Sequence, residues 1–261
     1  MSDPFGGGTT GKKKADGVAD AINKLLHTLV LRCTKSEGVR DYYHVGVIGY
    51  GSRVGPALGG KLTGQGLVPI KMIADNPLRI EQRTKQVDDG AGGILSQTVK
   101  FPTWFEPVAD GLTPMCEAFD LAWNLINDFI VRCPNCYPPM IVNITDGEAT
   151  DEAPGADLKI RAGMIRDMAS KDGNVVLFNL HISSSAEPPI EFPDKEATLP
   201  DDYARMLFRI SSPLPPPILQ TARREGFKVS EASRGFVFNA DLVSLIKFLD
   251  IGTRVDAKNL R

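Results

Sequence analysis

The segment Met140–Asp151 constrains the fold most, because a mostly apolar run there ends on Asp146, Gly147 and further acidic residues. Short continuous apolar runs are typical of strands buried on both faces of a parallel sheet. In open α/β sheets, ligands bind just beyond the carboxyl ends of the strands. The pattern predicts a buried parallel strand that delivers Asp146 to such an edge, although Asp-Gly is also a favourable dipeptide for a simple turn.

Apolar periodicity along the rest of the chain predicts helices that alternate with mostly buried strands. This alternation favours an α/β fold with a doubly wound, mostly parallel sheet flanked by helices. The length of 261 residues suits one domain, residues 1–261, with insertions at about 53–110 and 183–217. The expected helices are 16–33, 115–130, 156–168, 217–224 and 241–249, and the expected strands are 44–50, 94–101 (an edge or hairpin strand after a turn at 90–93), 140–145, 175–182 and 235–238.

A second motif lies at Gly111–Met115, where Thr113 precedes Pro114 and an amphipathic helical pattern. Threonine is favoured as an N-cap residue, and proline is favoured at the first helical position. Taken alone, Thr113 is therefore expected to cap the helix.

Together, the G-x-T-P-M helix start and the later strand ending in T-D-G resemble the von Willebrand factor A-type (VWA) domain, in particular its bacterial stand-alone members. The resemblance implies a metal-ion-dependent adhesion site, with Thr113 and Asp146 as ligands, direct or through water. Oxygen ligands suit Mg²⁺, with Mn²⁺ or Ca²⁺ as alternatives. It further implies a protein-interaction module rather than an enzyme, in which a carboxylate of a protein partner completes the coordination of the ion.

The chain departs from the VWA pattern in lacking the D-x-S-x-S loop and the first strand before it. Met1 resembles the methionine that commonly follows that loop in the family. A missing central strand would leave two rows of backbone groups unpaired. The sequence therefore leads to the expectation that the natural product begins upstream of Met1.

Composition narrows the classes of function. Charged residues make up 24% and apolar residues 42% of the chain, and the net charge is −2. These values are ordinary for a globular protein, and the net charge shows no basic excess that would indicate nucleic-acid binding. The short basic run Lys12–Lys14 is expected to be a solvated loop. No apolar segment is long enough for a membrane span or a signal peptide, which favours the cytoplasm.

The four cysteines are too few for a disulfide framework in a chain of this length. Cys133 and Cys136 have the spacing of a redox motif, but they follow a helix end, whereas a thioredoxin-type motif would open a helix. All four are expected to be reduced structural thiols.

An enzyme is the main alternative. Gly6–Lys12 matches most of a phosphate-binding P-loop, and Asp146 could then serve as metal ligand or base. Lys13 stands where that motif needs a hydroxyl, and no strand precedes the loop. The glycines after residues 44–50 are better explained as a strand exit than as a dinucleotide loop. Hydrolase motifs are absent, and His181, near a strand end, is a weak catalytic candidate.

A third possibility is a degenerate scaffold that binds no metal. Its docking surface would then include Trp104, Phe105 and the run Pro215–Pro217, for which core packing and a stiff turn are the plainer explanations.

Overall fold

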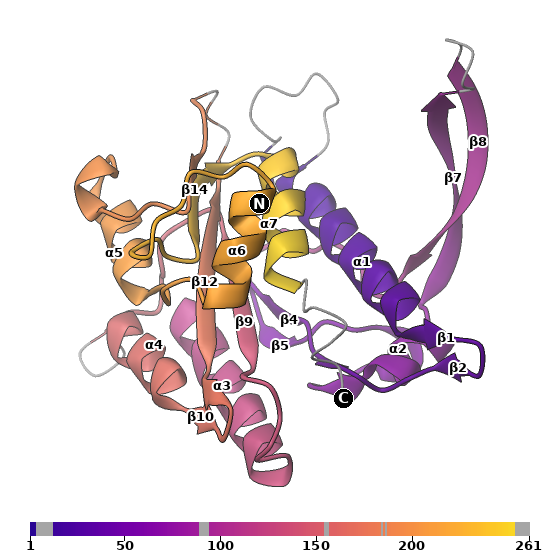
Figure 1. Ribbon diagram of the computed structural model, residues 1–261, viewed down its shortest axis with the longest axis horizontal. Coiled ribbons are helices and arrows are strands. Elements are labelled where there is room, and N and C mark those ends of the chain that lie inside the picture. The colour runs from indigo at the N-terminus through magenta and orange to yellow at the C-terminus, as the bar shows by residue number, and fades with distance from the viewer. Residues whose placement is uncertain (4–12, 89–93, 154–156, 184, 186, 254–261) are drawn as a thin grey trace. The chain divides into compact units, whose positions relative to one another are not determined.

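The computed structural model describes residues 1–3, 13–88, 94–153, 157–183, 185 and 187–253, and the chain forms two compact units (Figure 1). Unit 1 comprises Met1–Val18, Ile48–Gly55 and Val108–Arg261. Unit 2 comprises Ala19–Val47 and Pro56–Pro107. Helix α1 (Lys14–Cys33) begins in unit 1 and continues in unit 2. The turn expected at 90–93 and most of the P-loop-like segment lie outside the described residues.

Unit 1 contains a mixed sheet of four strands in the order β13-β14-β12-β9. Strands β9 (Met140–Thr145), β12 (Val176–Ile182) and β14 (Phe236–Ala240) are parallel, and β13 (Ile190–Glu191) pairs antiparallel with β14. In the register, Val176 lies opposite Met140 and His181 opposite Thr145. The predictions of an α/β fold and of these three parallel strands are confirmed.

Among the described residues, five α-helices lie wholly within unit 1. Helix α3 contacts α4, which contacts β12 in turn, and α7 contacts β14. Asp241 accepts a hydrogen bond from the Ser244 N–H at 2.7 Å, so it begins the last helix as the sequence predicts. The bounds are α3 (Met115–Arg132), α4 (Leu158–Asp167), α5 (Asp202–Ile210), α6 (Pro216–Arg224) and α7 (Leu242–Thr253).

Helix α5 was not expected, because the acidic and proline-rich composition around it favoured an insertion without regular structure. Asp201 caps this helix by accepting a hydrogen bond from the Ala204 N–H at 2.7 Å. Leu207 and Phe208 are buried, so the apolar face of this short helix packs against the core of unit 1. The pattern was too short for periodicity to reveal it.

A row of buried polar side chains crosses the sheet of unit 1. The Tyr50 hydroxyl donates to Asn143 Oδ1 at 2.8 Å, and Asn143 Nδ2 donates to Asn179 Oδ1 at 3.0 Å. Asn179 Nδ2 donates to Ser211 Oγ at 2.9 Å. Because buried polar groups are costly unless they are paired, these bonds fix the lateral positions of β9 and β12.

The single strand expected at 44–50 is wrong. The structure has β3 (His44–Val45), which pairs with β6 (Val68–Pro69), and β4 (Ile48–Tyr50), which pairs with β5 (Val54–Pro56). Between the two strands the backbone of Gly66 lies against Gly46, where a Cβ atom would be 2.1 Å from the Gly66 carbonyl oxygen, so this position requires glycine.

Unit 2 has its own core beneath α1. Buried Leu26, Ile70, Ile73 and Trp104 belong to one apolar cluster. The antiparallel hairpin of β7 (Arg79–Asp88) and β8 (Ile94–Thr103) confirms the expected hairpin strand. The remaining short elements are β1 (Thr34–Lys35), β2 (Gly38–Val39), η1 (Gly60–Leu62) and α2 (Ile70–Asp75) in unit 2, and β10 (Ala169–Ser170), β11 (Gly173–Asn174) and η2 (Glu196–Thr198) in unit 1.

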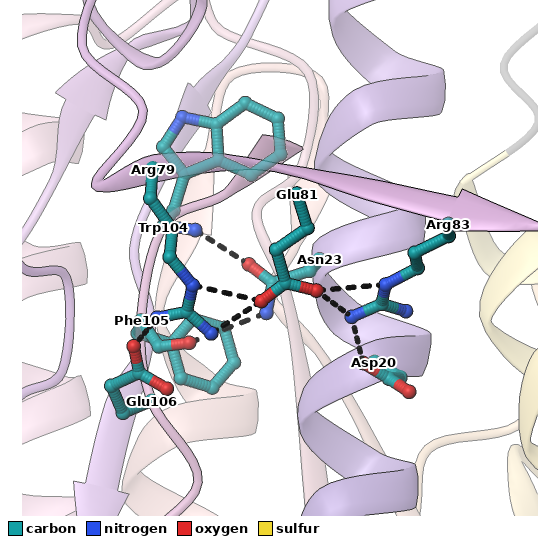
Figure 2. Close-up of polar contacts among 8 residues, drawn as sticks. All are labelled: Asp20, Asn23, Arg79, Glu81, Arg83, Trp104, Phe105 and Glu106. Carbon is teal, nitrogen blue, oxygen red and sulfur yellow. Dashed lines mark hydrogen bonds and ion pairs between the residues drawn. The ribbon is translucent and has the colours of Figure 1, made fainter. Parts of the chain in front are cut away.

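Polar contacts join the base of the hairpin to α1 within unit 2. Figure 2 shows Glu81 between the guanidinium groups of Arg79 and Arg83. Arg83 Nη2 also lies 2.8 Å from Asp20 on α1. Exposed ion pairs add little stability singly, and this chain of charges links the hairpin base to α1 through Arg83 and Asp20.

Candidate functional site

Asp146 directly follows β9 at the carboxyl end of the parallel strands, where the sequence predicted it. The turn after it is held by Thr145, whose hydroxyl accepts from the Gly147 N–H at 3.2 Å and donates to the Gly147 carbonyl at 2.7 Å. The Tyr203 hydroxyl donates to the same carbonyl. Asp146 is therefore presented by a firmly bonded turn at the sheet edge.

Thr113 lies at the same edge as Asp146. A Cβ atom on Gly147 would lie 3.6 Å from the Thr113 hydroxyl oxygen, an ordinary van der Waals distance, so the turn after Asp146 lies against Thr113. The Thr113 N–H donates to Thr150 Oγ1 at 2.9 Å, and the Thr150 N–H donates to the Thr113 carbonyl at 3.0 Å. The fold thus brings together the two residues that the sequence singled out.

The prediction that Thr113 caps the following helix is wrong. Helix α3 begins at Met115 with Pro114 in the N-cap position, and no side chain of the cap residue bonds to the helix. Instead, the Asp151 carboxylate accepts from the N–H groups of Cys116 at 3.1 Å and Glu117 at 2.9 Å. A carboxylate also complements the positive end of the helix dipole, so Asp151 does the capping and Thr113 is left for another role.

Lys14 is the site residue that sequence reasoning missed. Its side chain is buried, with a relative exposure of 6%, and its Nζ lies 3.7 Å from Asp146 Oδ2. The expectation of a solvated loop at Lys12–Lys14 is wrong for Lys14, which begins α1. Lys14 lies four residues before Val18, an apolar residue of the helix predicted at 16–33, and this helical spacing was the available signal.

The residues at this edge do not fit a divalent cation in the arrangement observed. The Asp146 carboxylate already pairs with the buried Lys14 ammonium group. Asp151 is engaged by the α3 backbone. Within the part of the chain that the structure describes, no group of three or more His, Cys, Asp or Glu residues could hold a metal ion. A divalent ion at Asp146 would have to share the site with a buried ammonium of like charge.

His181 lies behind this edge, on β12. Its ring stacks on Phe238 at a centroid distance of 4.6 Å and meets Tyr203 edge-on at 5.8 Å. The Asn239 N–H donates to His181 Nδ1 at 3.4 Å, which requires an unprotonated Nδ1. Burial, followed by the charge of Lys14, lowers the pKa of His181 to about 4.

The His181 environment predicts a pH-dependent loss of stability. The unfolded chain, with a histidine pKa of 6.5, binds a proton before the folded chain does as the pH falls. Stability contributed by neutral His181 is therefore present above pH 6.5 and is lost between 6.5 and about 4, by roughly 3 kcal/mol. Urea unfolding of the wild type and a His181→Gln variant across this range measures it. The variant should lose less stability on acidification; equal slopes would contradict the prediction.

A cleft of about 590 Å³ adjoins Thr113 in unit 1. Exposed Arg53 brings a positive charge to it, and Leu112, whose relative exposure is 70%, brings an apolar side chain. Glu117 and Thr150 lie on its wall. The cleft therefore carries charged, polar and apolar groups next to Thr113, a mixture suited to a protein contact.

Other sequence candidates lie elsewhere. Trp104 and Phe105 are buried in unit 2, with relative exposures of 2% and 7%, so they belong to the core and not to a docking surface. The cysteines are free thiols, with Cys133 exposed and Cys136 partly buried. Gly6–Lys12 falls within residues 4–12, outside the described residues.

Comparison of the chain with protein-family models, curated proteins and solved structures finds no match. Among the described residues, no helix is both long enough and apolar enough to cross a membrane.

Proposed function

We propose that this chain is a protein-interaction module of the VWA type, whose binding surface is the sheet edge around Asp146 and Thr113. The single observation that carries the proposal is the convergence of these two residues. Thr113 lies two residues before α3 and Asp146 directly follows β9, and a Cβ atom on Gly147, the residue after Asp146, would lie 3.6 Å from the Thr113 hydroxyl oxygen. No bond of a substrate would be made or broken in this role.

The adjoining cleft supports a carboxylate-bearing protein as the partner. The Arg53 guanidinium is exposed at the cleft and offers bidentate hydrogen bonds to a carboxylate. Exposed Leu112 offers an apolar contact beside it. A partner segment that combines an acidic and an apolar side chain would use both groups.

In the metal-dependent form of the proposal, Thr113 and Asp146 coordinate Mg²⁺, Mn²⁺ or Ca²⁺, and a carboxylate of the protein partner is the last ligand. The metal-independent form keeps the same surface without the ion. Lys14 favours the second form, because its ammonium group already neutralises Asp146. A doubly wound VWA fold remains part of the proposal in either form.

Site-directed photocrosslinking in the cell that makes the protein tests the surface. Benzoylphenylalanine at Leu112 should crosslink a partner, whereas the same group at exposed Tyr137, before the opposite end of β9, should not. Asp146→Asn, with an unchanged circular dichroism spectrum, should reduce the Leu112 crosslink about tenfold, a loss near 1.4 kcal/mol of binding energy. Equal crosslinking from both positions would contradict the proposal, and a crosslink abolished by EDTA would select the metal-dependent form.

A further inference from the structure

We infer that Lys14 is the resident cation of the Asp146 site, so that a side-chain ammonium occupies the position where the VWA resemblance would have a divalent ion. The inference rests on the proposed function only where it treats this edge as a binding site. The pairing of Lys14 with Asp146 itself needs no protein partner.

The burial of Lys14 is the first observation that supports this role. Its relative exposure is 5%, whereas the neighbouring Lys13 is exposed. Lysine is almost never fully buried unless its charge is paired, because desolvation of an ammonium group is costly. Asp146, at 3.7 Å from Nζ, supplies that pairing charge.

The start of α1 holds Lys14 in place. Its backbone N–H donates to the Asp3 carbonyl at 2.8 Å, and the Ala15 N–H donates to the Met1 carbonyl at 3.2 Å. These bonds occupy N–H groups that the first turn of a helix leaves without intrahelical partners. The helix therefore begins at a fixed point, with its first side chain at the Asp146 carboxylate.

The surroundings of His181 fit a single ammonium charge at this edge. Its Nδ1 accepts from the Asn239 N–H at 3.4 Å and is therefore unprotonated, and the charge of Lys14 is, after burial, the second cause that lowers the pKa of this histidine. Neutral His181 adds no further positive charge to the pocket. The Asp146 carboxylate and the Lys14 ammonium group thus form a close pair. A divalent ion placed at Asp146 would be repelled by the ammonium charge.

The consequence is that removing the Lys14 ammonium should open the pocket to external cations. Lys14→Ala deletes a fragment equivalent to propylammonium and leaves Asp146 as the binding group for it. Lys14→Met keeps the volume of the side chain and removes only its charge. Lys13→Ala is the matched control, because it removes an exposed lysine one residue away.

The experiment measures thermal unfolding and Mn²⁺ binding on the full chain. Lys14→Ala should lower the Tm by roughly 5 °C or more, since it leaves Asp146 without its lysine, whereas Lys13→Ala should not. Propylammonium chloride should restore part of this loss, and neutral propanol should restore none. Mn²⁺, followed by electron paramagnetic resonance, should bind Lys14→Met at least about tenfold more tightly than the wild type, and adding Asp146→Asn should abolish that gain.

Two results would overturn the inference. One is Asp146-dependent Mn²⁺ binding to the wild type as tight as to Lys14→Met. The other is an unfolding temperature of Lys14→Met equal to that of Lys13→Ala, which would show that the lysine charge has no partner. Since neither measurement involves a protein partner, failure here leaves the photocrosslinking test of the interaction surface intact.

Discussion

Replacing Gly235 by alanine is expected to destabilise unit 1 by about 3 kcal/mol or more, through overpacking. A Cβ atom there would lie 1.9 Å from Cδ1 and 2.3 Å from Cε1 of Phe178. The Phe178 ring is fully buried and packs edge-on against Phe248 at 5.8 Å between centroids. The Phe178 ring therefore has no free space into which it could move.

The backbone at Gly235 is equally constrained. Its N–H donates to the Ser212 carbonyl at 2.9 Å, and its carbonyl accepts from the Asn179 N–H at 2.9 Å. Urea unfolding followed by circular dichroism measures the loss. Gly163→Ala is the control, because a Cβ atom there meets nothing within 4 Å and alanine in a helix interior should stabilise by about 1 kcal/mol. Phe178→Leu should restore part of the stability of Gly235→Ala, and a fully stable single variant would contradict the packing described.

Trp104→Ala is expected to cost about 4 kcal/mol, because it removes the largest buried side chain of unit 2. The indole N–H donates to the Ile73 carbonyl at 2.6 Å, and the Trp104 backbone N–H donates to Asn23 Oδ1 at 2.8 Å. Figure 2 shows Asn23 on α1 bonded between Trp104 and Phe105. The substitution should loosen α1, α2 and the hairpin base together.

Amide hydrogen exchange distinguishes this effect from a general loss of stability. Protection should fall first at Ile73 and along α1 within unit 2, before it falls in β12 of unit 1. Trp104→Phe is the graded control: it keeps most of the apolar volume but leaves the Ile73 carbonyl without its donor, at a cost of about 1–3 kcal/mol. Trp104→Ala and Trp104→Phe of equal stability would contradict a packing role for the indole.

The sequence predicted the parallel strands and the position of Asp146 because both depend on local patterns. A buried strand needs a short apolar run, and β9 and β12 have one each. Asp241 was predicted as a cap for the same reason, since the preference acts over three residues. Such features hardly depend on distant parts of the chain.

Features set by tertiary approach could not be predicted in this way. Gly46 lies between β3 and β4, and the backbone of Gly66, distant in sequence, lies against it. Asp151, distant in sequence from α3, replaces Thr113 as the group that caps that helix. Lys14 is buried only because α1 begins beside the end of β9. Each depends on which segments the fold brings together, and residue patterns within one segment do not contain that information.

The most direct test of this account of the site is a crystal structure of the full chain grown with Mn²⁺, with anomalous diffraction data. We expect the Lys14 ammonium against the Asp146 carboxylate and no anomalous peak between Asp146 and Thr113. A manganese peak bonded to Asp146, with the Lys14 side chain turned away, would contradict the account and establish the metal-dependent form of the interaction site.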